Sequence, residues 1–228
     1  MRILIIDNNR DPKSWGAADL RRFTQSLTGA TTITRRAPHG DLPESPSAFD
    51  RIILSGSATS VMEDAPWISE LMDFVKRAVN ENKPLLGVCY GHQILNRALG
   101  GAERVARAKE AEFGWTKIEV LNESPLLEGV PKTFYSFSAH FDEVKSLAPG
   151  MKNLAKSQAC SVQACQLGSS PIFGIQFHPE KNLKDAAQTF AERHKVGKPK
   201  NLLHEGESEK YYDPKIGEAV FGNFFKSL

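Results

Sequence analysis

The sequence predicts a single α/β domain over 1–228, with an open, largely parallel central sheet, helices on both faces and a partly antiparallel C-terminal section. Two patterns predict this fold class. Short apolar runs alternate with amphipathic stretches through the first hundred residues, as in parallel sheets that are covered on both faces. After Gly101, strand-like segments follow one another with few helices between them. A length of 228 residues fits one large domain or two small ones, and because no internal repeat divides the chain we expect one.

The N-terminal half supplies the parallel strands and their helices. Four short apolar or β-branched runs are expected to be strands: Arg2–Asp7, Thr31–Arg35, Arg51–Leu54 and Pro84–Cys89. Apolar residues at helical spacing predict helices near Trp15 to Leu27, from Pro66 to Val79, and from Gly91 to Gly100. Asp64 is expected to cap the second helix, and Pro66 lies in its first turn, where a missing N–H breaks no hydrogen bond.

The C-terminal half is richer in strands. We expect them at Trp115–Leu121, Thr133–Phe137, Ser161–Leu167 and Ile172–Phe177. Two closing helices are expected at Asp185–Arg193 and Glu218–Phe225. The polar stretch between these helices, at about 195–214, is rich in charges and is interpreted as a loop or an insertion.

Composition excludes several classes of protein. Hydrophobic residues at 40% and charged residues at 25% are ordinary for a globular chain and exclude a disordered or collagen-like one. A formal charge of +2 gives no reason to expect nucleic acid or an acidic membrane as partner. Only four apolar residues stand between Arg2 and Asp7, too few for a signal peptide, and no stretch resembles a membrane span. We therefore expect a cytoplasmic protein.

The three cysteines do not form a disulfide or metal pattern. Cys160 and Cys165 are an odd number of residues apart, so on a strand they would point to opposite faces. A single CxxxxC pair without a second cluster is weak evidence for a metal site. We expect reduced thiols, no metal and no other cofactor.

The segment Gly87–Gly91 (GVCYG) follows a predicted strand and opens a predicted helix. This is the context of a nucleophile elbow, where glycines on either side let strand and helix approach closely and the central residue projects from a tight turn. Cys89 would lie at a helix N-terminus, where the dipole and free N–H groups favour thiolate. A buried cysteine in a glycine-flanked turn explains the pentapeptide equally well.

A cysteine nucleophile needs a base, and the base needs an orienting partner. Among six histidines, His178 ends an apolar strand, and Glu180 lies two residues later with Pro179 between them. Residues i and i+2 of an extended segment share a face, so the two side chains can be neighbours. His-x-Glu alone is common, but its pairing with a cysteine at the end of another strand is more specific. His92, just after the elbow, is interpreted as a packed or capping histidine.

Three separated motifs carry a family resemblance: SGSATSV at 55–61, CYGHQ at 89–93 and GIQFHPE at 174–180. In this order and spacing they resemble a class I glutamine amidotransferase domain, most nearly of the GMP-synthase type. The likeness extends from Arg2 to Glu180 and resumes at 222–225 (GNFF). It implies a triad with Cys89 as nucleophile, His178 as base and later acid, and Glu180 as the orienting carboxylate. The reaction implied is hydrolysis of the glutamine side-chain amide through a γ-glutamyl thioester, releasing ammonia and then glutamate.

The resemblance also implies an oxyanion hole made by the backbone N–H groups of Tyr90 and of the Gly56–Ser57 turn. Gln93 matches the family glutamine that lines the substrate pocket. Where relatives have Gly-Gly-Pro, this chain has Gly56-Ser57-Ala58, so the hole is less firmly assigned than the triad.

A second departure lies in the loop that helps hold the substrate's amino-acid end. Relatives have Ser-His-Gly-Asp, and this chain has Ala139-His140-Phe141-Asp142. Phe141 is therefore expected to reshape the substrate pocket. His140 and Asp142 are interpreted as part of the pocket wall, with a second acid–base pair as the alternative. Glu112 and Gly114 resemble an E-x-G element of the family, and a plain turn before a strand explains them equally well.

No Gly-rich phosphate loop followed by Lys-Ser/Thr occurs, and little length remains for an ATP-binding synthetase domain. The first hypothesis is therefore a stand-alone amidotransferase that uses L-glutamine and supplies ammonia to a separate synthetase. The second is a partner-independent hydrolase of γ-glutamyl peptides or amides with the same triad. Phe141 and the long 195–214 segment slightly favour this second hypothesis. The third, a binding module with a vestigial site, is disfavoured because Cys89, His178 and Glu180 are all present.

Overall fold

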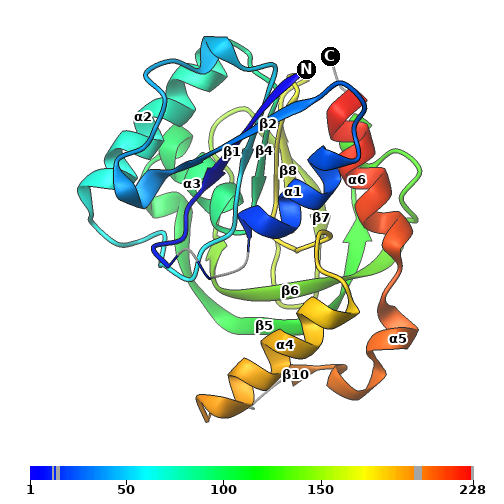
Figure 1. Cartoon of the computed structure of the whole chain (residues 1–228). Helices are drawn as coiled ribbons and strands as arrows, with labels where there is room; N and C mark the ends of the chain where they lie inside the picture. The colour runs from blue at the N-terminus through cyan, green and yellow to red at the C-terminus, as the bar shows by residue number, and fades with distance from the viewer. Residues whose placement is uncertain (12, 14–15, 198–201, 227–228) are drawn as a thin grey trace.

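A ten-stranded sheet organises the described part of the chain, residues 1–226 without 12, 14–15 and 198–201, in the computed structural model (Figure 1). The strands are β1 (Arg2–Asp7), β2 (Thr31–Arg36), β3 (Arg51–Leu54), β4 (Leu85–Val88), β5 (Val105–Val120), β6 (Thr133–Val144), β7 (Met151–Lys156), β8 (Ala164–Leu167), β9 (Ile172–Ile175) and β10 (Leu202–Leu203). The helices are α1 (Ala17–Gln25), α2 (Pro66–Asn80), α3 (Tyr90–Gly100), α4 (Leu183–Lys195), α5 (Ser208–Tyr211) and α6 (Pro214–Lys226). Within the described residues, no helix is long and apolar enough to cross a membrane.

The sheet has a parallel and an antiparallel part. Its order is β10-β5-β7-β8-β9-β4-β3-β1-β2, with β6 paired to β5. In the parallel part, the neighbouring strands are β2, β1, β3, β4 and β9. In the antiparallel part, β9 pairs with β8, β8 with β7, β7 with β5, and β5 with β6. The predicted fold class is confirmed. In the register of β4 with β9, Val88 pairs with Ile175, so the chain leaves both strands at the same edge of the sheet.

The two faces of the sheet are covered because alternate residues of each strand point to opposite sides. In β1, Ile3 and Ile5 pack in one buried cluster with α1 and α6, and Leu4 and Ile6 pack in another with α2 and α3. The central strands β3 and β4 are fully buried, as predicted from their continuous apolar runs. This rigid layer supports the carboxyl ends of β3, β4 and β9.

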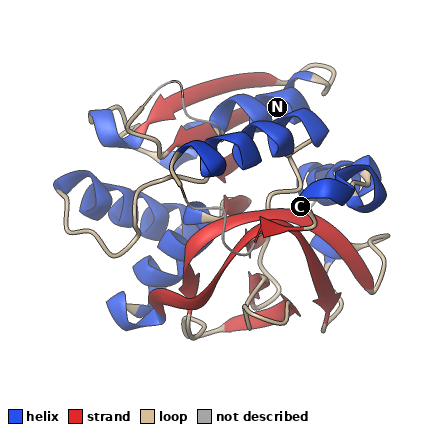
Figure 2. Cartoon of the chain, turned by 90° about the horizontal axis from the view of Figure 1, so that it is seen from below, coloured by secondary structure: helices blue, strands red, loops and turns tan. Residues whose placement is uncertain are grey.

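Some elements differ from the sequence predictions. The N-cap of α2 is Ala65, with no side-chain cap hydrogen bond, so the expected Asp64 cap is wrong, whereas Pro66 begins the helix as predicted. The long curved strands β5 and β6 of Figure 2 extend well beyond their predicted ranges, and β7 was not predicted. Charged residues on the exposed face of β5 hide its strand pattern. Trp15, placed at the start of the first predicted helix, lies outside the described residues.

The described part of the 195–214 segment folds back onto β5 (Figure 1). Leu203 of β10 pairs in parallel with Gly114, whose φ is +118°. A Cβ at Gly114 would lie 2.1 Å from the Leu203 carbonyl oxygen, so this approach requires glycine. In α5, Ser208 Oγ accepts a 2.9 Å hydrogen bond from Trp115 Nε1. These contacts join the segment after α4 to the far edge of the sheet.

Candidate active site

Cys89 occupies the turn between β4 and α3 with a φ of 51° and a ψ of −102°, an unusual conformation for a non-glycine residue. Its N–H donates to the Ile175 carbonyl oxygen at 2.7 Å, which ties the turn to β9. A Cβ at Gly87 would lie 2.3 Å from the Gly91 carbonyl oxygen, and one at Gly91 would lie 2.4 Å from that of Leu54. Both glycines are sterically required, and the strand–turn–helix context predicted for Gly87–Gly91 is present.

His178 and Glu180 follow β9 and are both buried. His178 Nδ1 lies 2.6 Å from Glu180 Oε1, and the His178 side chain also contacts that of Cys89. Burial lowers the pKa of His178, but the Glu180 carboxylate and the Cys89 contact outweigh it and raise this pKa to about 9. The backbone N–H of His178 donates to the carbonyl oxygen of Phe137 in β6 at 2.7 Å, which fixes the backbone position of His178. The three residues that the sequence singled out are therefore brought together.

Gly56, directly after β3 and Ser55, lies against these residues. A Cβ on Gly56 would be 3.0 Å from His178 Cε1 and 3.6 Å from Cys89 Cβ, so the turn passes close to both side chains. The Ser57 hydroxyl donates to the Asn8 carbonyl oxygen at 2.8 Å, which orients the turn. The Tyr90 side chain packs in the core, where burial raises its pKa, and its backbone N–H belongs to the first residue of α3.

A pocket of about 210 Å³ opens over Cys89 and His178. The predicted pocket residues Gln93, His140, Phe141 and Asp142 all line it. The remaining lining residues come from several elements: Asn9, Gly56, Ser57, Ala58, Thr59, Ser60, Arg107, Phe113, Ala139, Thr189, Glu192 and Arg193. Gln93 Nε2 donates to the Asp142 carbonyl oxygen at 2.6 Å and to Gln176 Oε1 at 3.0 Å, which fixes this wall of the pocket.

Sequence reasoning missed the contributions of β5 and α4 to this pocket. One face of α4 contributes Thr189, Glu192 and Arg193 to the pocket, since the latter two lie three and four residues after Thr189. That spacing was visible in the sequence, but nothing there indicated that the face turns to the pocket. Arg107 and Phe113 lie in the part of β5 that was not predicted as a strand.

His140 and Asp142 do not form the alternative acid–base pair through their side chains. Asp142 Oδ2 accepts from Ser60 Oγ at 2.6 Å, and its Oδ1 pairs with Arg107 Nη1 at 3.1 Å. His140 Nδ1 lies 3.1 Å from the Asp142 backbone carbonyl oxygen, and its Nε2 lies 2.9 Å from Glu112 Oε2. Both residues thus serve the pocket wall.

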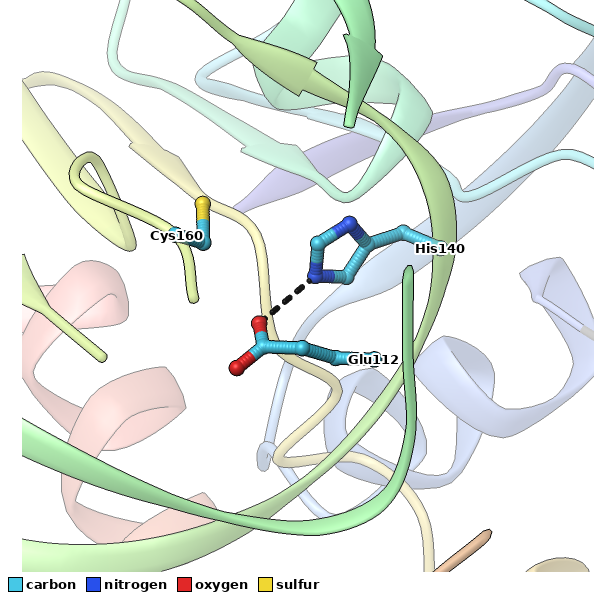
Figure 3. A group of neighbouring side chains, drawn as sticks. All are labelled: Glu112, His140 and Cys160. Atoms are coloured by element: carbon cyan, nitrogen blue, oxygen red, sulfur yellow. Dashed lines mark hydrogen bonds and ion pairs between the residues drawn. The ribbon is translucent and has the colours of Figure 1, made fainter. Parts of the chain in front are cut away.

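Glu112 is the centre of a buried polar group behind that wall (Figure 3). Besides His140, its carboxylate accepts hydrogen bonds from Ser157 Oγ and Gln163 Nε2, each at 2.7 Å. Ligand atoms of Glu112, His140 and Cys160 lie within 4.8 Å of one another, a grouping that can hold a metal ion. Burial raises the pKa of the Cys160 thiol. Glu112 thus lies within β5 as a buried anchor, which corrects the alternative interpretation of a plain turn before a strand.

The other thiols lie apart from the pocket lining. All three cysteines are free and buried. Cys165 Sγ lies 3.5 Å from His92 Nδ1. Burial lowers the pKa of His92 to about 3, so its ring is neutral. His92 lies in the first turn of α3 and packs against Cys165 of β8, as the sequence interpretation favoured.

The family model described as glutamine amidotransferase class-I matches residues 19–196. The chain belongs to this family. It is 39% identical over 182 residues to a glutamine-hydrolysing GMP synthase subunit from Methanocaldococcus jannaschii, covering 78% of this chain and 87% of the relative. The corresponding protein from Thermococcus kodakarensis is 42% identical over 115 residues, covering 49% of this chain and 60% of the relative.

A solved glutamine amidotransferase from Methylobacillus flagellatus shares the fold, with a TM-score of 0.78 and 23% identity over 100% of this chain and 95% of its own. The family match and the Methanocaldococcus jannaschii relative confirm the class I glutamine amidotransferase resemblance drawn from the three sequence motifs. They also confirm the predicted class of enzyme, a glutaminase-type cysteine hydrolase.

Proposed function

We propose that this class I amidotransferase hydrolyses the side-chain amide of L-glutamine and supplies the ammonia to a separate synthetase polypeptide. The proposal rests on one observation: the His178 side chain contacts Cys89 at the pocket, and its Nδ1 lies 2.6 Å from Glu180 Oε1. Nucleophile, base and orienting carboxylate in series are the arrangement that covalent acyl transfer needs. The relatives named as GMP synthase subunits support the separate partner.

In this proposal, the Cys89 thiol gives its proton to His178, Sγ attacks the amide carbon of the substrate and a C–S bond forms. His178 gives its proton to the departing nitrogen, the C–N bond breaks, and ammonia leaves a γ-glutamyl thioester. His178, now neutral, takes a proton from the water that attacks the thioester. The C–S bond then breaks, the glutamate product leaves, and His178 returns its proton to Sγ. Glu180 acts by holding the imidazole and by stabilising its charged form, consistent with the raised pKa of His178.

The backbone N–H groups of Tyr90 and of the Gly56–Ser57 turn are the proposed oxyanion donors. The N–H of Tyr90 belongs to the first turn of α3, where backbone donors have no helical partner. The close approach of Gly56 to Cys89 and His178 supports the second donor. Each preorganised donor of this kind contributes roughly 10²–10³ in rate.

A second candidate function is hydrolysis of γ-glutamyl peptides or amides without a partner. The Phe141 ring favours it, because this ring lies at the pocket with Arg107 and Arg193 around it and changes the shape of the substrate site. The catalytic steps are the same, with an amine in place of ammonia as the leaving group.

The test is glutamate release by the purified chain from L-glutamine and from a panel of γ-glutamyl peptides. Cys89→Ala is the inactive variant, and Cys165→Ala is a matched control because that thiol is buried outside the pocket lining. Slow, Cys89-dependent turnover of glutamine alone supports an amidotransferase that awaits its synthetase. Good turnover of a peptide with poor turnover of glutamine supports the hydrolase. Equal glutamate release by Cys89→Ala contradicts both.

A further inference from the structure

Two arginines and two phenylalanines from three different elements meet at the pocket; we call them the Arg–Phe cluster. Its members are Arg107 and Phe113 of β5, Phe141 of β6 and Arg193 of α4. The Phe113 and Phe141 ring centroids are 4.8 Å apart. Arg193 Cζ lies 4.0 Å from the Phe113 centroid and 5.0 Å from that of Phe141. The rings thus hold the Arg193 guanidinium by cation–π contact.

The two arginines differ in their partners. Arg107 forms an ion pair with Asp142 at 3.1 Å, and its side chain is 61% exposed. Arg193 has no ion pair with any described residue, and its Nε is buried without a hydrogen-bond partner among them. Burial lowers the pKa of Arg193. The neighbouring carboxylate of Glu192 accepts from Gln188 Nε2 at 3.0 Å and is not its counter-ion.

A partly desolvated guanidinium without a counter-ion, held rigidly at a pocket that contains a nucleophile, is suited to an anionic ligand. A guanidinium binds a carboxylate through two parallel hydrogen bonds. Because the Phe113 and Phe141 rings already orient the Arg193 side chain, it loses less conformational entropy when a ligand binds. The carboxylate of Asp142 in the pocket wall pairs with Arg107 and accepts from Ser60, so it is engaged elsewhere.

We infer that Arg193, oriented by Phe113 and Phe141, binds a carboxylate of the γ-glutamyl substrate. The inference rests on the proposed function and deepens it. A γ-glutamyl substrate has two sources of such a group: the α-carboxylate of its glutamyl part, which every substrate has, and a carboxylate on the leaving amine, which only some have. Arg193 is in either case a specificity-determining residue of the pocket.

The test compares KM and kcat of the wild type, Arg193→Gln and Arg193→Lys on L-glutamine, γ-glutamylethylamide and γ-glutamylglycine. Loss of a charge-assisted pair raises KM about 10- to 100-fold. A rise on all three substrates assigns the α-carboxylate, and a rise on γ-glutamylglycine alone assigns the leaving amine. Arg193→Lys is expected to restore part of the loss, because it keeps the charge without the planar fork. Unchanged KM on all three substrates overturns the inference.

A binding measurement separates this inference from the proposed function. Calorimetry on Cys89→Ala gives the Kd of each of the three compounds without turnover, and Cys89→Ala/Arg193→Gln should bind about 10- to 100-fold more weakly. Arg21→Gln, an exposed arginine of α1 outside the pocket lining, is the matched control and should not change Kd. If the wild type releases no Cys89-dependent glutamate, the proposed function fails, while Kd still decides the role of Arg193. Equal Kd values for Cys89→Ala and Cys89→Ala/Arg193→Gln, or no binding to Cys89→Ala, overturn the inference that Arg193 binds the substrate carboxylate.

Discussion

The Glu180→Gln substitution tests the electrostatics of the candidate triad most directly. In the wild type, burial lowers the pKa of His178, and the carboxylate 2.6 Å away is the largest of the causes that raise it to about 9. An amide keeps the size of the side chain and can still accept a hydrogen bond, but it carries no charge. We therefore expect the pKa of His178 in the variant to fall towards its ordinary value of 6.5, with burial still lowering it and the Cys89 contact still raising it.

The magnitude follows from the two pKa values. A fall from about 9 to 6.5 corresponds to roughly 3 kcal/mol of lost proton affinity at His178. For a fall to 6.5, the protonated fraction of His178 at pH 7.5 drops from about 97% to about 9%, which lowers about 10-fold the population able to protonate the leaving nitrogen. Loss of orientation adds to this, so kcat/KM at pH 7.5 should fall about 10- to 100-fold, less than in Cys89→Ala.

The assay is the pH profile of kcat/KM for glutamate release between pH 5.5 and 10. The wild type should lose activity as pH rises through about 9, and the alkaline limb of Glu180→Gln should be displaced from there towards pH 6.5. Glu70→Gln, an exposed carboxylate of α2, is the matched control and should follow the wild type. A Glu180→Gln profile that is merely scaled down, with the same alkaline limb, would refute the electrostatic role. Losses equal to those of Cys89→Ala would also contradict a role in orientation.

The same pKa shift predicts a pH dependence of stability. The folded pKa of His178 lies above the unfolded value, so the stabilisation is complete below pH 6.5 and is lost as pH rises through about 9, which denaturant titrations of wild type and Glu180→Gln would resolve. Cys89→Ala should abolish glutamate release with a nearly unchanged melting temperature; retained turnover would remove Cys89 as nucleophile. Gly91→Ala should lower the unfolding free energy by about 2 kcal/mol or more, because its new Cβ would meet backbone atoms of Leu54. Gly222→Ala should raise it by up to about 1 kcal/mol, because a Cβ there has nothing within 4 Å. An unchanged unfolding free energy in Gly91→Ala would contradict the close approach of α3 to β3. Glu112→Ala should cost about 2–4 kcal/mol in denaturant unfolding, because three buried donors lose their acceptor, and a loss below about 1 kcal/mol would deny that Glu112 is an anchor.

The parallel layer of the sheet and the position of the candidate nucleophile, Cys89, could be predicted from the sequence alone. Runs such as Arg51–Leu54 and the glycines around Cys89 encode local geometry, a buried strand and a tight turn, and local geometry leaves a periodic or steric trace in the sequence. For the same reason His178 and Glu180 were found as neighbours: two residues of one extended segment need no knowledge of the fold. The family resemblance followed from these short-range motifs.

The residues that surround Cys89 in the pocket could not be predicted in this way, because they come from distant segments of the chain. Arg193 is more than 100 residues from Cys89 in the chain, and nothing in the pattern of α4 indicates which of its faces turns to the pocket. Glu112 looked as much like a turn as a site residue, because its partners His140 and Gln163 come from segments that meet it only through long-range strand pairing. Contacts between distant segments depend on how the antiparallel strands curve and pack, and no local spacing records that.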